Sequence, residues 1–215
     1  MIETIGTSTG TARAEARGSG GRTLRVPNGA AHIEIGAAPA TPEPFAAEFR
    51  GSRPSVVIGD EGVTVDYGRL RSVGWFIGGF RRTSGRIRLS DDAPWWFEFR
   101  RGLADLDADL RGLRLRGLDV RGGVHRVRLR LPEPHGSVIV RISGGANRLE
   151  IRRPVRTEFR LRIGGGVSGL AVDDQRFGAI GGGVEWATPG YADSSDRYVI
   201  EIVGGARRLF VGTDR

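Results

Sequence analysis

The chain has 215 residues, which is enough to bury a substantial hydrophobic core. It contains no cysteine, so disulfide bonds, thiol chemistry and cysteine-ligated zinc are excluded. The formal net charge is +8, and all 33 basic residues are arginine. Because these arginines alternate with apolar residues, they are typical of a solvated outer face, and we do not expect nucleic acid as a partner.

The first 21 residues are rich in Thr, Ser, Gly, Ala and Arg, a composition that predicts a disordered tail. They lack the basic and apolar regions of a secretory signal, and no apolar run in the chain approaches the ~18 residues of a transmembrane segment. We therefore expect a cytoplasmic protein with a tail at 1–21 and a single folded domain at 22–215. Within that domain, 69–83 is expected to be irregular and 103–211 to be the most regular part.

Alternating apolar residues predict short strands that are separated by turns. In RTLRVPNGAAHIEI, two such runs flank a Pro-Asn-Gly turn, and the following run PFAAEFRG is compatible with a strand or a single helical turn. Residues 56–58 and 63–67 flank a Gly-Asp-Glu-Gly sequence that predicts a hairpin. Further along, PWWFEFR predicts a strand that has Trp95, Phe97 and Phe99 on one face.

Residues 69–83 break this pattern, because the segment SVGWFIGGFRRTS crowds aromatic side chains next to arginines without the periodicity of a core. A contiguous apolar patch beside arginines is typical of a contact site for another protein. The alternative is a cap that covers one end of a repeating fold. Our candidate partner-contact residues in this segment are Trp75, Phe76, Phe80, Arg81 and Arg82.

A repeat dominates the C-terminal half of the chain, where glycine clusters begin at 122, 144, 164, 181 and 204, about 20 residues apart. Alternation after the clusters predicts a buried face made of Val127, Leu129, Leu131, Val138, Val140, Ile142, Leu149, Ile151, Phe159, Leu161, Ile163, Leu170 and Val172. The opposite face carries Arg126, Arg128, Arg130, Arg141, Arg160 and Arg162. A glycine corner at the same place in each unit allows positive φ there and favours stacked coils. The pattern predicts a β-solenoid of about 20-residue coils, with a β-sandwich as the alternative.

The run PWWFEFRRGLADLDADLRGLRLRGLDVRGGVHRVRLRLPEPHGSVIVRISGGANRLEIRRP, continued by GGGVSGLAV and GGARRLFV, carries a resemblance. It resembles the C-terminal β-helical domain of LiaF-like, cell wall-active antibiotics response proteins, and related adhesin-like bacterial domains. The resemblance covers 22–211 and is clearest over 94–211. It implies a right-handed parallel β-helix and a role in modulating a sensor kinase of the cell-envelope stress response, and it supplies no catalytic residue.

Three aspartates alternate in ADLDADL, at Asp105, Asp107 and Asp109. Clustered acids on a sheet can act as general acid–base pairs in enzymes that cleave polysaccharides. The ordinary explanation is charge pairing across strands, here with Arg114 and Arg116 of the next strand. We favour charge pairing over catalysis.

The three histidines, His32, His125 and His135, lie in separate units, and no ordered spacing of Cys, His or Glu joins them. Asp173 and Asp174 are expected to cap a turn, because a calcium site needs more oxygen ligands in a fixed order. We therefore expect no catalytic residue, no metal and no cofactor.

These observations favour a non-enzymatic binding or regulatory module that is linked to cell-envelope stress signalling through protein contacts. The expected partner is then a sensor kinase-like or envelope-associated protein. The alternative is a structural solenoid that self-associates through its open ends, since uncovered terminal strands are adhesive. In that case the partner is a second copy of the chain, in a homo-oligomer.

Overall fold

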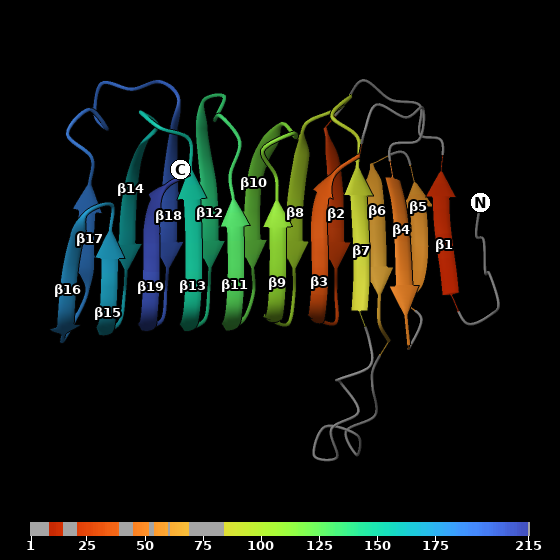
Figure 1. Cartoon of the computed structure of the whole chain (residues 1–215), viewed down its shortest axis with the longest axis horizontal. Coiled ribbons are helices and arrows are strands. Elements are labelled where there is room, and N and C mark those ends of the chain that lie inside the picture. The colour runs from red at the N-terminus through yellow and green to blue at the C-terminus, as the bar shows by residue number, and fades with distance from the viewer. Residues whose placement is uncertain are drawn as a thin grey trace, which may run out of the picture.

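The structure is a computed structural model that describes residues 9–14, 21–38, 45–51, 54–59, 61–68 and 84–214. The described chain is all β and forms a ten-stranded and a nine-stranded sheet that lie face to face (Figure 1). Within these ranges there is no helix, and so none that is long and apolar enough to cross a membrane.

In both sheets the spatial order of the strands differs from their order in the chain. From one edge to the other, the ten-stranded sheet consists of β1 (Thr9–Ala14), β4 (Phe45–Arg50), β7 (Ser84–Leu89), β3 (Ala30–Ala37), β9 (Leu103–Asp109), β11 (Val124–Arg130), β13 (Ala146–Arg153), β19 (Ala206–Thr213), β15 (Val167–Val172) and β16 (Gln175–Ile180). The nine-stranded sheet consists of β17 (Val184–Ala187), β14 (Glu158–Ile163), β18 (Arg197–Ile202), β12 (Ser137–Ile142), β10 (Leu115–Val120), β8 (Trp95–Phe99), β2 (Arg22–Val26), β6 (Gly62–Asp66) and β5 (Ser55–Gly59).

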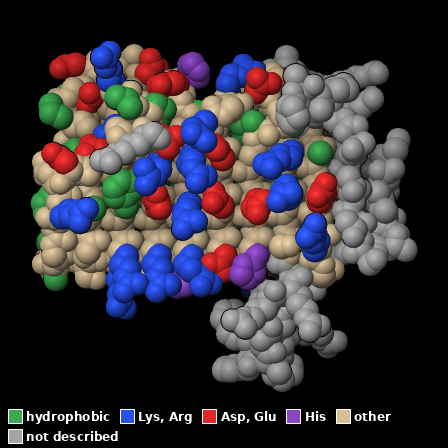
Figure 2. All heavy atoms as spheres, viewed as in Figure 1, with side chains coloured by type: hydrophobic (Ala, Val, Ile, Leu, Met, Phe, Trp, Pro, Cys, Tyr) green, Lys and Arg blue, Asp and Glu red, His purple; other side chains and the backbone are tan. Residues whose placement is uncertain are grey.

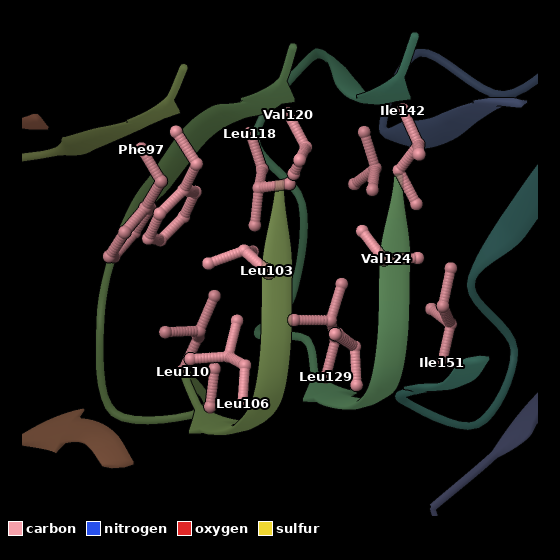
Figure 3. Packing of buried hydrophobic residues seen from close by; sticks show 14 of the residues in the cluster. Phe97, Leu103, Leu106, Leu110, Leu118, Val120, Val124, Leu129, Ile142 and Ile151 are labelled. Carbon is pink, nitrogen blue, oxygen red and sulfur yellow. The ribbon is translucent and has the colours of Figure 1, made fainter. Parts of the chain in front are cut away.

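The hydrophobic core fills the space between the two sheets. Successive side chains of a strand point to opposite faces, so an alternating sequence buries every second residue. Figure 3 shows Leu118 and Val120 of β10 on one side of the core and Leu106 and Leu129 of the other sheet across from them. Every apolar residue that the alternation assigned to the buried face of the repeat is at most 2% exposed, which confirms that prediction.

The expected right-handed parallel β-helix is wrong, because both sheets are mixed and their strands do not lie in chain order. The middle pairs, such as β9–β11 and β10–β12, are parallel. At the ends, β1–β4, β4–β7 and β15–β16 of one sheet and β5–β6 and β14–β17 of the other are antiparallel. A β-sandwich of antiparallel strands does not describe the parallel middle either.

Strand order departs from chain order near both ends of the chain. Near the N-terminus, β3 lies between β7 and β9, and β2 lies between β6 and β8. Strand β18 lies between β12 and β14, and β19 lies between β13 and β15. This insertion leaves no mark in the sequence, because each repeat ends in a similar glycine corner and its strands can pair with those of any other repeat. The antiparallel pair β15–β16 has a local cause: Asp173 and Asp174 form a two-residue link, which joins antiparallel but not parallel strands.

Several predictions for the N-terminal part have a clear outcome. The predicted hairpin is confirmed as β5–β6, and PFAAEFRG forms a strand, β4. In β8, Trp95, Phe97 and Phe99 share one face of the strand, as predicted, and they are at most 1% exposed. Strand β1 lies within the expected tail at 1–21 and pairs with β4.

Candidate functional site

The strands in the middle of the ten-stranded sheet share an irregularity near their first residues. After each glycine corner the sequence reads apolar–x–x–apolar, as in VHRV, ANRL and ARRL. In β11, His125 and Arg126 both point out of the core, between two buried valines. The ladder skips one residue per strand as a result: His125 pairs with Asn147, the next valine pairs with Leu149, and Arg126 and Arg148 have no ladder partner.

Each skipped residue has a left-handed backbone. We call these residues the bulge row; from β3 to β15 they are His32, Asp105, Arg126, Arg148, Arg208 and Gly169. The five non-glycine members have φ between 54° and 57°. This conformation costs a non-glycine residue about 1–3 kcal/mol, whereas glycine adopts it freely, as Gly169 does in β15.

The residue types in the bulge row are informative because the backbone does not favour all of them. Asp and His are enriched among non-glycine residues with positive φ, but arginine is not. Three neighbouring strands nevertheless carry arginine at a position where glycine would be less strained. Backbone strain of this kind is found at functional sites, so the side chains of Arg126, Arg148 and Arg208 are the first candidates for a function.

The charge of the bulge row is neutralised at one end and free at the other. The Nδ1 atom of His32 lies 3.3 Å from a carboxylate oxygen of Asp105, and Arg126 donates a 2.6 Å hydrogen bond to the same carboxylate. Among the described residues, no carboxylate lies within ion-pairing distance of Arg148 or Arg208. Figure 2 shows arginine side chains following one another along the lower edge of the molecule, where the strands of this sheet begin.

A shallow groove runs beside the bulge row along the glycine corners, and we call it the glycine groove. Its floor is backbone: Val124 N–H donates to the Gly145 carbonyl at 2.9 Å, and Ala146 N–H donates to the Gly205 carbonyl at 3.0 Å. Its polar side chains are His125, Asn147 and Arg207. Asn147 Nδ2 lies 3.2 Å from His125 Nδ1, so these two side chains form a hydrogen-bonded pair.

A second groove of about 540 Å³ lies on the other side of the bulge row, on the outer face of the sheet. It is lined by Arg126, Arg148 and Arg208 of the bulge row together with acids further along the strands. These acids are paired: Asp107 accepts from Arg130 at 2.9 Å, and Glu150 accepts from Arg152 at 2.6 Å. Its aromatic residue is Phe210, whose ring is covered by the guanidinium of Arg152 at 5.2 Å. Arginines and acids are intermixed over this broad face in Figure 2, so their charges offset one another there. The positive charge that no acid offsets is therefore concentrated at the edge.

The candidate contact residues of the sequence, Trp75, Phe76, Phe80, Arg81 and Arg82, lie outside the described residues. Within the described ranges, no three His, Asp or Glu side chains come together in a way that could hold a metal ion. The bulge row itself was missed, although the repeated apolar–x–x–apolar spacing after each glycine corner could have indicated it.

The three aspartates of β9 form charge pairs, but not with the expected Arg114 and Arg116. Asp105 pairs with Arg126, Asp107 with Arg128 and Arg130, and Asp109 with Arg111. The expectation was wrong because the next strand in sequence, β10, belongs to the other sheet, whereas β9 pairs with β3 and β11.

Two buried polar groups brace the inserted C-terminal strands. Arg153 at the end of β13 is 4% exposed and reaches past β19 to donate hydrogen bonds of 2.9 and 2.7 Å to Asp173. Burial lowers the pKa of Arg153, although Asp173 acts in the opposite direction. The Tyr198 hydroxyl of β18 donates a 2.9 Å hydrogen bond to the Pro132 carbonyl, and burial raises the pKa of this tyrosine. Both groups therefore have a structural role.

Glu98 of β8 is a third buried polar group, with a side chain that is 9% exposed. It accepts hydrogen bonds of 2.8 Å from both Arg25 and Arg100. Burial by itself raises the pKa of Glu98, but these hydrogen bonds outweigh burial and hold the pKa below its usual value. The carboxylate is thus ionised at neutral pH and joins β2 to β8 on the outer face of the nine-stranded sheet.

Two solved structures align with this chain over nearly its whole length. A candidate cell adhesion protein from Clostridium sporogenes ATCC 15579 has a TM-score of 0.70 and 17% sequence identity, with 95% of this chain and 99% of that chain covered. A candidate adhesin from Bacteroides fragilis NCTC 9343 has a TM-score of 0.31 and 10% identity, with 97% and 98% of the two chains covered. No protein-family model and no curated protein matches the sequence. The first likeness shows that the fold is shared.

Proposed function

We propose that the protein is a non-enzymatic binding module that contacts an extended partner along the bulge row and the glycine groove. The observation that carries this proposal is the strained arginine at Arg126, Arg148 and Arg208, in a conformation that favours glycine. The fold shared with a candidate cell adhesion protein supports a binding role. The glycine groove is shallow and continuous across neighbouring strands, which suits a long partner better than a small enclosed substrate.

Co-sedimentation of the full chain with a washed bacterial cell-envelope fraction tests this proposal. The variant R148G/R208G removes two free charges and also relieves backbone strain, so it should fold normally and remain in the supernatant. The matched control is R141S/R162S, which removes two arginines from the outer face of the other sheet and should sediment like the parent. If the parent does not sediment, or if both variants sediment equally well, the proposal fails.

The resemblance to LiaF-like proteins extends this proposal to a regulatory role in cell-envelope stress, with a sensor kinase-like or envelope-associated protein as the partner. The resemblance alone supports this extension. Trp75 and Phe80 are the residues to change, because an apolar patch beside arginines is a typical protein contact. A partner that is recovered under envelope stress by the parent but not by W75A/F80A is the expected result, and equal recovery would contradict it.

Self-association is a second candidate function, and one observation favours it. Strand β5 ends the nine-stranded sheet, and its Val57 is 47% exposed. An edge strand with an exposed apolar residue can pair with the same strand of another copy. Light scattering should show a mass that rises with concentration and falls back in Val57→Lys, whereas a constant monomeric mass would argue against self-association.

A further inference from the structure

We propose that the bulge row recognises a linear acidic polysaccharide, with carboxylate or sulfate groups along the polymer bound by successive arginines. This inference rests on the proposed function and names the class of partner. Arg148 and Arg208, together with Arg207 of the glycine groove, are exposed and have no carboxylate partner among the described residues. Their charge is therefore available to an anion from outside the chain.

The spacing of the row suits a polymer that repeats its charge. One residue of the bulge row comes from each strand, and adjacent strands of a sheet lie about 4.8 Å apart. Arginines therefore recur at this interval over β11, β13 and β19, and the two that have no carboxylate partner among the described residues, Arg148 and Arg208, lie on the adjacent strands β13 and β19. A planar guanidinium can hold a carboxylate or sulfate through two parallel hydrogen bonds, so each arginine can take one acidic group.

The groove beside the row supplies what a sugar ring requires. Asn147 presents an amide donor and acceptor, and His125 presents a ring nitrogen; both can bond sugar hydroxyls. The glycine floor has no side chains that would hold an extended chain away from these groups. At the far end Asp105 repels a further anion and accepts from a hydroxyl, so the row favours acidic groups near Arg148 and Arg208 rather than near His32.

Nucleic acid fits this surface less well. Proteins that bind single strands combine a basic groove with aromatic side chains on which bases stack. Among the described residues that line the two grooves, the aromatic one is Phe210, and Arg152 covers its ring. A membrane surface needs apolar side chains that enter the lipid beside the cations, and the apolar residues between the arginines, such as Leu149, are buried.

The test uses defined polymers and the full chain. Binding is measured by titration calorimetry to polygalacturonate and to its fully methyl-esterified form, and to dextran sulfate and uncharged dextran. Poly-dT and vesicles that contain anionic phospholipid complete the set. We expect binding to at least one acidic polysaccharide, an affinity at least about tenfold lower for its uncharged counterpart, and a further loss of about tenfold in R148G/R208G. The control R141S/R162S should keep the parent affinity.

The backbone gives this test an internal check on folding. Because R148G and R208G relieve left-handed strain, the variant should melt no lower than the parent while it loses affinity. The inference is overturned if no acidic polysaccharide binds, if the uncharged polymers bind equally well, if DNA or vesicles bind more tightly, or if both variants lose affinity equally. Failure of every polymer, with envelope co-sedimentation still dependent on Arg148 and Arg208, would reject the polysaccharide and leave the binding surface standing.

Discussion

Substitution of Gly144 by alanine tests whether the glycine corners set how closely the strands pack. A Cβ atom at this position would lie 2.5 Å from the carbonyl carbon of Gly122 and 2.6 Å from the nitrogen of Gly123. Both are backbone atoms that cannot rotate away, so the two corners must move apart and weaken the 3.1 Å hydrogen bond from Gly144 to Gly122. The φ of Gly144 is not positive, so the effect is steric.

The expected magnitude follows from these contacts. Overpacking of a filled site costs about 1–3 kcal/mol, and in a chain of this size each kcal/mol lowers Tm by about 2–4 °C. We therefore expect thermal unfolding, followed by circular dichroism, to show a loss of about 2–12 °C for Gly144→Ala. The control is Gly181→Ala, whose Cβ has no atom within 4 Å and whose backbone is not left-handed. Equal melting temperatures for the two variants would refute the close-packed corner.

Three further changes probe the buried polar groups. Asp173→Asn removes the ion-pair partner of the buried Arg153 and should lower the free energy of unfolding by about 3 kcal/mol in denaturant titrations. Tyr198→Phe removes a buried donor and should lower the free energy of unfolding by about 1–2 kcal/mol. Because burial raises the pKa of Tyr198 in the parent, this difference should not change with pH up to about pH 10. The lowered pKa of Glu98 contributes stability that is complete above pH 4.5 and is lost as the pH falls through the folded-state pKa; Glu98→Gln should therefore flatten the acid limb of the stability curve.

The alternation of apolar residues was sufficient to predict the core. Val127, Leu129 and Leu131 alternate with arginines, and a strand can satisfy that pattern in one way, with the apolar side buried. Strand order could not be read from the same pattern. Any repeat that ends in a glycine corner offers equivalent backbone hydrogen bonds to its neighbours, so nothing in β18 or β19 indicates that they insert between earlier strands.

The candidate site was missed for a related reason. Period-2 alternation around Val127 places Arg126 on the outer face, where it lies in the structure, but does not distinguish it from the other solvated arginines. The preceding residue, His125, also faces outward, and two consecutive outward residues require a break in the pleat. That break is visible in the spacing of Val124 and Val127, but its left-handed backbone depends on pairing with strands far away in the sequence.

The most direct test of the account is to map the binding surface by NMR. The full chain, labelled with ¹⁵N, is titrated with the polymer or envelope glycan that binds it, and backbone amide shifts are followed. We predict shifts at the first residues of β11, β13 and β19, including His125, Asn147 and Arg207, with β10, β12 and β18 unchanged. Shifts that fall instead on the nine-stranded sheet, or on residues 69–83 alone, would contradict the claim that the bulge row is the binding surface.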